Sequence, residues 1–312
     1  MAVREQPLAQ SLAQPLAQPL AQPLARRSTA SPTLRLLSRL FREKPLGAAG
    51  GVVFVLFLFI GLFADLLAPY GANQINPINR LKPPSSMFLF GTDNLGRDVL
   101  SRCIYGAQLS VIIGFCAAGL ATLISVAIGI VTGYLGGKVD LITQRFVDAW
   151  QSFPDLVVLI VVVSVVGPGM PQIIVTLGLL LGVAGSRIIR SAVLSVREHM
   201  YVHAAQSIGA STARILWRHV LPNVLAPIVV LFTTRVGAVI LIESALSFLG
   251  LGVPPPAPTW GGMLSGSGRA FMFHGPWLAL APGLCLTIVV YAINVFGDAL
   301  RDLFDPRMRG SR

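Results

Sequence analysis

Charged side chains are scarce in this sequence: only 12% of its 312 residues are Asp, Glu, Lys or Arg, whereas 54% are hydrophobic. A soluble domain carries about twice that share of charge, because its surface must be hydrated, so an ordinary water-soluble fold is excluded. The mean hydropathy of +0.73, together with apolar blocks long enough to cross a bilayer, predicts an all-α membrane protein.

Acidic residues are especially few, 13 against 24 Lys and Arg, which gives a net charge of +11. A surplus of this size also occurs in nucleic-acid-binding proteins. Here, however, most of the basic residues lie in the N-terminal region, in segment 201–222 and in the C-terminal region, on one side of the apolar blocks. This is the positive-inside distribution, so we expect these regions and both termini in the cytoplasm and no nucleic-acid partner.

Cysteine and histidine are too few and too scattered to form a metal or disulfide site. Cys103, Cys116 and Cys285 show no CxxC or Cys/His spacing, and the sequence contains no HExxH. We therefore expect neither a bound metal nor a disulfide framework.

A phosphate-binding loop is also missing. The stretch 133–140, GYLGGKVD, is superficially like one, but Thr132 replaces its first glycine and Val139 replaces the Ser or Thr that would hold magnesium. ATP hydrolysis that drives this chain must therefore take place on another polypeptide. A serine–histidine dyad for intramembrane proteolysis, Ser267 with His274, has little support because both residues fall in one Gly/Pro-rich segment that would not fix their geometry.

The apolar blocks predict six transmembrane helices with both ends of the chain in the cytoplasm. The second contains small residues, such as Gly129, that permit close helix packing. The third is too short on its own, so we start it upstream and expect a kink at Pro154. The expected spans are about 47–68, 107–133, 139–166, 171–187 with a helical continuation to 199, 223–249 and 277–296.

The chain before the first span divides into two parts. Residues 6–25 repeat Leu-Ala-Gln-Pro, and a proline at every fourth position blocks a continuous helix, so we expect 1–32 to be a disordered tail. Residues 33–46 place leucines on one face and arginines on another, as a basic amphipathic interfacial helix would. The remaining expected parts are 47–106, the first span and an external loop with an elbow helix; 107–299, the core with the other five spans and cytoplasmic loop 200–222; and 300–312, a cytoplasmic tail.

The polar segment 201–222, YVHAAQSIGASTARILWRHVLP, reads as helix, tight turn, helix between two apolar blocks. Gly209 stands where a left-handed residue would end the first helix, and Ser211 is placed to cap the second, which we expect Pro222 to stop. Lipid would leave the charges of such a hairpin unpaired. The segment therefore predicts a docking surface for a partner in the water phase.

The same segment resembles the EAA loop in the membrane subunits of ATP-binding cassette importers, whose spacing it keeps at Ala204, Ala205, Gly209, Leu221 and Pro222. Its RHVLPN wording is similar to the dipeptide, oligopeptide and nickel permease branch.

Two positions of the loop depart from the family pattern. His203 stands in place of the leading acidic residue, and His219 in place of an apolar residue two positions before the leucine. The first departure removes any role that a carboxylate plays there. In the family this loop docks in a groove of the ATPase subunit, and the resemblance implies the same for these coupling residues: His203, Ala204, Ala205, Gly209, Ser211, Arg214, Arg218, Leu221 and Pro222.

The resemblance covers residues 33–310. ESALSFLGLG at 243–252 is specific to this permease branch, and GDALRDLFDPR at 297–307 resembles its C-terminus. The external segment matches as well, and we expect it to serve as a structural elbow or, alternatively, to contact a binding protein or gate the outer mouth. Its matching residues are Thr92, Asp93, Gly96, Arg97 and Asp98.

The resemblance implies a type I importer permease fold in the bacterial inner membrane, with this chain forming half of a translocation pore. The implied partners are a second homologous permease, two ATPase subunits that bind ATP and magnesium, and an extracytoplasmic solute-binding protein. No cofactor is expected on this chain, and it is not itself an enzyme. Di- or oligopeptides are the expected solutes, with nickel or metal chelates, glutathione and opines as alternatives. An ion-coupled carrier is the alternative from another class, but it would leave loop 200–222 without a purpose.

Arg235 and Glu243 are the two charged residues of the expected span 223–249. They lie eight residues apart, roughly 12 Å along a helix and about 80° around it, and so cannot pair with each other. A charge in a span is costly unless it faces a partner, water or the bundle interior. Two interpretations stay open: pairing with a neighbouring helix or subunit, or a place on the translocation path or its gate.

Overall fold

The computed structural model describes residues 32–304, and helices dominate them, with no β-strand in this range. Residues 39–304 belong to one compact unit; the described residues before Arg39 belong to another and form the first turns of α1. The predicted tail 1–32, apart from its last residue, and the tail beyond residue 304 lie outside the described residues. The longer helices are α1 (Pro32–Glu43), α2 (Pro45–Leu62), α4 (Val99–Leu135), α5 (Gly137–Gln151), α6 (Asp155–Val166), α7 (Met170–Arg197), α8 (Met200–Ser207), α10 (Leu225–Phe248) and α13 (Trp277–Phe304).

The predicted all-α membrane fold is confirmed. Five helical segments are long and apolar enough to cross a membrane, and the bent pair α5–α6 makes a sixth span if it is counted as one. The predicted kink at Pro154 is a sharp bend of 79° between these two helices. Pro154 is extended and precedes the first residue of α6, because its ring removes a backbone donor and excludes a continuous helix.

The expected elbow helix is not a separate element, which corrects the boundary placed at residue 107. Helix α4 begins at Val99 and runs without a break to Leu135, so one 37-residue helix contains both the elbow and the second span. The carboxylate of Asp98 caps its first turn by accepting a hydrogen bond from the backbone N–H of Ser101 at 2.7 Å. Gly136 and Gly137 end it, since their φ angles of 65° and 55° are readily adopted only without a side chain.

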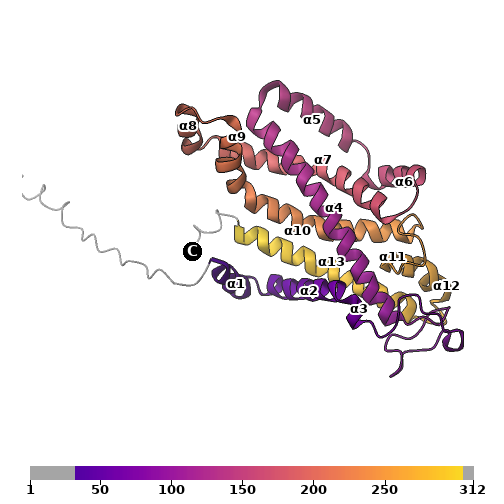
Figure 1. The fold of residues 1–312 in the computed structure, drawn as a ribbon. Coiled ribbons are helices and arrows are strands. Elements are labelled where there is room, and N and C mark those ends of the chain that lie inside the picture. The colour runs from indigo at the N-terminus through magenta and orange to yellow at the C-terminus, as the bar shows by residue number, and fades with distance from the viewer. Residues whose placement is uncertain (1–31, 305–312) are drawn as a thin grey trace, which may run out of the picture. The chain divides into compact units, whose positions relative to one another are not determined.

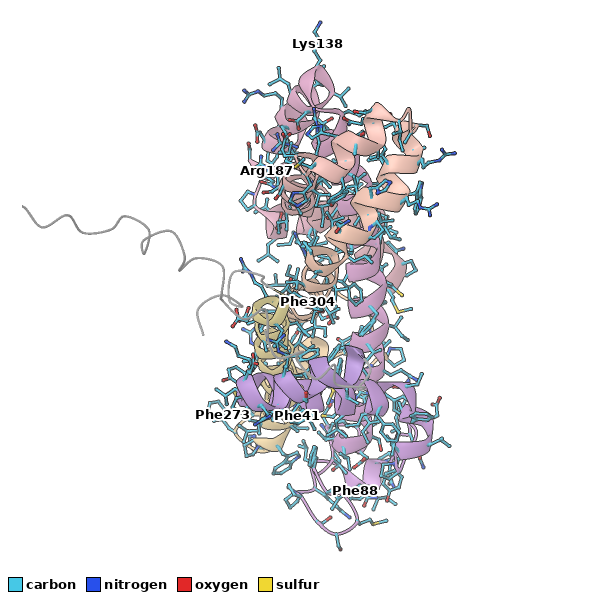
Figure 2. All side chains as sticks on the ribbon, turned by 90° about the vertical axis from the view of Figure 1, so that its left-hand side faces the viewer. Phe41, Phe88, Lys138, Arg187, Phe273 and Phe304 are labelled. Carbon is cyan, nitrogen blue, oxygen red and sulfur yellow. The ribbon has the colours of Figure 1, made fainter. Side chains whose placement is uncertain are left out.

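Small structural elements are concentrated at the two ends of the unit. Figure 1 shows α8 and α9 (Thr212–Ile215) at one end and α11 (Trp260–Met263) and α12 (Arg269–Phe271) at the other. The end bearing the irregular segment 68–98 contains Phe88, and Lys138, after the α4–α5 turn, marks the opposite end (Figure 2). The expected internal and external segments are thus sorted to opposite ends.

Helix α7 contacts its neighbouring helices α4 and α5 in the unit. It packs along α4, and two of its arginines form ion pairs with α5, where Arg190 binds the carboxylate of Asp140 through Nε and Nη2, each at 2.5 Å. Arg187 pairs with Asp148 through a single contact, from Nη2 to Oδ1. Paired in this manner, the charges at the end of the span avoid the cost of an isolated charge in the membrane.

Glycines set the separation of α4 and α7. A Cβ on Gly129 would lie 2.7 Å from Cβ of Ile189 and 2.8 Å from the carbonyl oxygen of Ser186, both on α7. A Cβ on Gly182 of α7 would lie 2.8 Å from Cβ of Ile124 on α4. The predicted close packing of the second span is therefore confirmed, and its partner is α7.

We predict that Gly129→Val destabilises the protein by about 1–3 kcal/mol, because the two helices must separate to admit the side chain. Gly119→Val is the matched control: it lies on the same helix, and a Cβ there would meet nothing within 4 Å. Unfolding of the detergent-solubilised variants by increasing SDS measures the difference. Equal unfolding midpoints for the two variants would contradict this packing.

Candidate functional site

The hairpin predicted over 201–222 is present. Helix α8 ends at Ser207, and Gly209 follows with φ of +79°, the predicted left-handed residue. The backbone N–H of Gly209 donates to the carbonyl of Gln206 at 2.9 Å, and that of Ala210 donates to Ala205 at 3.1 Å. These two bonds form a Schellman motif, which satisfies the free carbonyls at the helix end and reverses the chain.

Ser211 occupies the predicted N-cap position of the second helix, but its side chain makes no capping hydrogen bond. Its carbonyl instead accepts the first helical bond, from the N–H of Ile215 at 3.0 Å. The backbone of Ser211 therefore begins the helix, and its hydroxyl does not contribute to the cap.

Pro222 does not stop the second helix, contrary to expectation. The helical path continues from Thr212 to Phe248 by way of a π turn (Leu216–Val220) and a 3-10 turn (Leu221–Val224). The π turn ends where the N–H of Leu221 donates to Leu216, and the side chain of Asn223 donates to the carbonyl of His219 at 2.6 Å. This change of hydrogen-bond register lets the helix continue through Pro222, which has no backbone N–H to donate, while the neighbouring carbonyls keep hydrogen-bond partners.

The inner face of the hairpin is anchored to the ends of α4 and α7. Gln206 donates a hydrogen bond to the hydroxyl of Tyr134 at 3.0 Å, and the Tyr134 carbonyl accepts from Arg197 at 3.0 Å. A cluster of buried side chains adds apolar contact. Its members are Tyr134, Ile189, Val193, Val196, Val202, Ala205, Ile215, Val220, Val224 and Leu231.

Among the predicted coupling residues, Ala205 faces inward, where it is buried with this cluster. Leu221 is half-buried, whereas the remaining residues are exposed at the tip and outer face of the hairpin. These are His203, Ala204, Gly209, Ser211, Arg214, Arg218 and Pro222. Arg214 and Arg218 form no ion pair with any residue that the structure describes.

Two further residues of this surface were missed by the sequence reasoning. Ile208 is 85% exposed beside the Gly209 turn, and Trp217 is 73% exposed on the second helix. Large apolar side chains at such exposure, next to arginines, are typical of the centre of a protein interface. In the sequence, the signal for this surface was that Ile208 and Trp217 are large apolar residues outside the set of hairpin residues whose spacing places them on the inner face.

Arg235 and Glu243 both lie on α10, and neither forms an ion pair with the other described residues. Glu243 is 1% exposed; its carboxylate accepts a hydrogen bond from the Ser247 hydroxyl at 2.6 Å and a longer one from Ser244 at 3.4 Å. Arg235 is half-buried beside Gly185 of α7 and makes no hydrogen bond to a described group. Of the two open interpretations, pairing with a neighbouring helix is therefore not seen as an ion pair among the described residues.

The external segment is held by the five residues predicted for it. The carboxylate of Asp93 accepts hydrogen bonds from the backbone N–H of Leu95 and Arg97 at 2.8 and 2.9 Å, and from Nε of Arg97 at 2.6 Å. The hydroxyl of Thr92 accepts from the N–H of Lys82 and donates to the carbonyl of Asn79.

The backbone around the same turn is equally constrained. Gly96 has φ of +74°, and a Cβ there would overlap the carbonyl of Asn76. Together with the cap that Asp98 places on α4, these contacts tie the external segment to the first turn of that helix.

Ser267 and His274 do not form the dyad considered for intramembrane proteolysis. Ser267 lies in a π turn (Leu264–Gly268) and His274 in the exposed turn that follows α12, and no hydrogen bond joins them in the described structure.

The comparisons with known proteins agree with this arrangement. Residues 125–310 match the family described as binding-protein-dependent transport system inner membrane component. The chain belongs to this family. Residues 33–84 match in addition the N-terminal transmembrane domain of oligopeptide transport permease C. This permease is accordingly a multi-pass component of the inner membrane in a binding-protein-dependent transporter, and not an ion-coupled carrier.

Two curated relatives and one solved structure resemble the permease over most of their length. The dipeptide transport system permease protein of Alkalihalophilus pseudofirmus is 38% identical over 90% of this chain and 92% of its own. A glutathione transport system permease protein of Escherichia coli is 37% identical over 87% and 90%. The MetNI methionine transporter, solved in inward-facing conformations, has a chain with a TM-score of 0.50 and 17% identity, covering 65% of this chain and 97% of that one. This last likeness shows the fold alone.

We predict that Asp93→Ala loosens the external segment of the permease, since each buried donor left without its acceptor costs about 1–3 kcal/mol. Trypsin cleavage after the exposed Arg80 should become several-fold faster, as followed by mass spectrometry on the purified protein. Ser86→Ala, at an exposed position of the same segment, is the control and should leave the rate unchanged. Indistinguishable rates for the two variants would show that Asp93 does not hold this turn.

Proposed function

We propose that this permease forms one half of the translocation pore of an ATP-driven importer of di- or oligopeptides, and that hairpin 200–222 couples it to a separate ATPase subunit. The observation that carries the proposal is the outer face of the hairpin, which is anchored to α4 and α7. It presents two exposed apolar side chains and two arginines that form no ion pair with the described residues. The names of the relatives, for dipeptide and oligopeptide transport, support the choice of solute.

The proposed coupling is mechanical. Closing and opening of two ATPase subunits, which bind ATP and magnesium, would push and pull the hairpin, and Tyr134 and its apolar neighbours would pass this movement to α4 and α7. Arg214 and Arg218 would meet acidic residues of the ATPase groove, while Ile208 and Trp217 fill its apolar part. The small side chain of Ala204 would permit close approach of the ATPase subunit. Ala205 would support this contact by packing the hairpin against the rest of the permease.

The proposed assembly includes a second, homologous permease and an extracytoplasmic solute-binding protein. Both termini and 200–222 lie in the cytoplasm, and segment 69–98 faces the binding protein. We keep the expected parts 1–32, 33–46, 47–106, 107–299 and 300–312 as a proposal for how the chain is organised, with the elbow now part of α4.

Glutathione is the second candidate solute, and the 37% identity to a glutathione transport permease favours it. Glutathione is itself a tripeptide, so both candidates belong to one chemical class. Selection between them would fall to the binding protein.

We predict that Gly209→Val abolishes coupling without disturbing the membrane bundle. The residue must keep a left-handed conformation, which costs a β-branched side chain roughly 1–2 kcal/mol or more, although nothing lies within 4 Å of its Cβ position. The substitution therefore acts by straining the backbone of the turn and not by crowding its neighbours. We expect this strain to reorient the tip of the hairpin. In cells that express the whole importer, uptake of a labelled tripeptide should be lost, whether or not ATP hydrolysis continues.

Gly209→Asn is the matched control, because asparagine tolerates the left-handed conformation, and it should retain most of the uptake. Normal uptake by Gly209→Val would refute the coupling role of the hairpin.

A further inference from the structure

A cavity of about 430 Å³ opens at the end of the bundle opposite to the hairpin. Two parts of the chain that are distant in sequence build it. One is the external turn with the start of α4; the other comprises the proline-rich segment 250–257 after α10 and the π turn of 264–268 with its neighbours. Its volume lies in the range of about 300–1,000 Å³ typical of small-molecule sites. A π turn is itself a departure from regular helix that is frequent at functional sites.

The charged residues that line the cavity are Arg97 and Arg102, and no acidic residue of the described chain joins them in its wall. Both guanidiniums face a single carboxylate: Oδ2 of Asp93 lies 2.6 Å from Nε of Arg97 and 3.9 Å from Nε of Arg102. Asp98 forms no ion pair with either arginine in the described structure; its carboxylate accepts hydrogen bonds from the N–H and hydroxyl of Ser101. One positive charge is therefore in surplus.

Each arginine also retains unused hydrogen-bond donors. Arg102 is 7% exposed and spends Nη1 on the carbonyl of Ala72, at 2.9 Å, and on the side chain of Asn73. Its Nη2, and both terminal nitrogens of Arg97, donate to no group that the structure describes. None of these nitrogens is among the buried atoms that lack a partner, so they can donate to an anionic ligand in the cavity.

The remaining lining fits a small polar ligand. Ser265 and Ser267 line the cavity from the π turn, and three consecutive prolines, 254–256, form a stiff part of its wall. Ser247 lines it as well and donates its hydroxyl to the buried Glu243, so that this carboxylate lies behind the wall and not in it.

We propose that the cavity binds the C-terminal carboxylate of the transported peptide on its way from the binding protein into the pore, an inference that rests on the function proposed above. Two guanidiniums suit a carboxylate because each offers paired donors in a plane. A free C-terminal carboxylate is also shared by all unmodified linear peptides, whatever their side chains. The site would hence recognise peptides as a class and not a particular sequence.

The test introduces a carboxylate side chain into the wall of the cavity. Ser267→Asp would compete with the peptide for Arg97 and Arg102, whereas Ser267→Asn has the same shape without the charge. The complete importer is reconstituted in proteoliposomes, and uptake of labelled trialanine is measured against the concentration of loaded binding protein. Arg97→Gln removes the recognising group, and Arg269→Gln, an exposed arginine outside the cavity, is its control.

We expect the maximal uptake rate to fall about tenfold or more in Ser267→Asp and Arg97→Gln, as the loss of a charge-assisted hydrogen bond implies, and to stay within about twofold in both controls. The concentration of binding protein at half-maximal rate should not change. No trialanine uptake by the unmodified importer would overturn the peptide function and this inference together.

With uptake intact in the unmodified importer, three results would overturn the inference alone. One is equal rates for Ser267→Asp and Ser267→Asn, which would make charge irrelevant. Another is an unchanged Arg97→Gln variant. The third is a raised half-saturating concentration of binding protein at an unchanged maximal rate, which would assign the arginines to docking of that protein.

Discussion

Helix α4 lies against α7 at a separation that glycines on both helices permit, and the two ends of the molecule depend on this pair. At one end, Tyr134 near the C-terminus of α4 and Arg197 at the end of α7 hold the 200–222 hairpin. At the other, the first turn of the same α4 carries Asp98 and Arg102, which fix the external segment. A single 37-residue helix thus spans the distance between the proposed ATPase surface and the proposed peptide cavity.

This arrangement gives a physical route for coupling across the membrane. A close-packed helix pair transmits displacement because it has no space in which to absorb it. The ion pairs between Arg190 and Asp140 and between Arg187 and Asp148 add α5 to the moving unit. The sharp bend at Pro154 then separates this rigid part from α6. Motion at the hairpin would reach the outer end through α4 in particular.

Much of this could be predicted from the sequence where one residue determines one local feature. The spans followed from apolar length, the left-handed turn from Gly209, and the break between α5 and α6 from Pro154. Pro222 was misjudged because a π turn upstream changes the hydrogen-bond register, which a proline in the sequence does not reveal. The separate elbow was wrong because residues 99–107 contain no proline and their one glycine, Gly106, does not interrupt α4, so the change from polar to apolar residues there is no helix boundary.

Features that arise from distant segments could not be found in this way. The cavity combines residues near 97, 250 and 265, and its surplus charge depends on which arginine Asp93 meets. The exposure of Ile208 and Trp217 likewise depends on which face of the hairpin α4 and α7 cover. The buried Glu243 was recognised from the cost of its charge, but its serine partners on the same helix required the structure.

Photo-crosslinking in living cells can show which protein the hairpin contacts. A benzophenone amino acid is placed at Ile208, on the hairpin, or at the 91% exposed Phe273, at the opposite end, in cells that contain the whole importer. We expect position 208 to capture an ATPase subunit and position 273 never to do so. Capture of an extracytoplasmic protein at position 208, or of an ATPase at position 273, would contradict both the docking surface and the orientation of the chain.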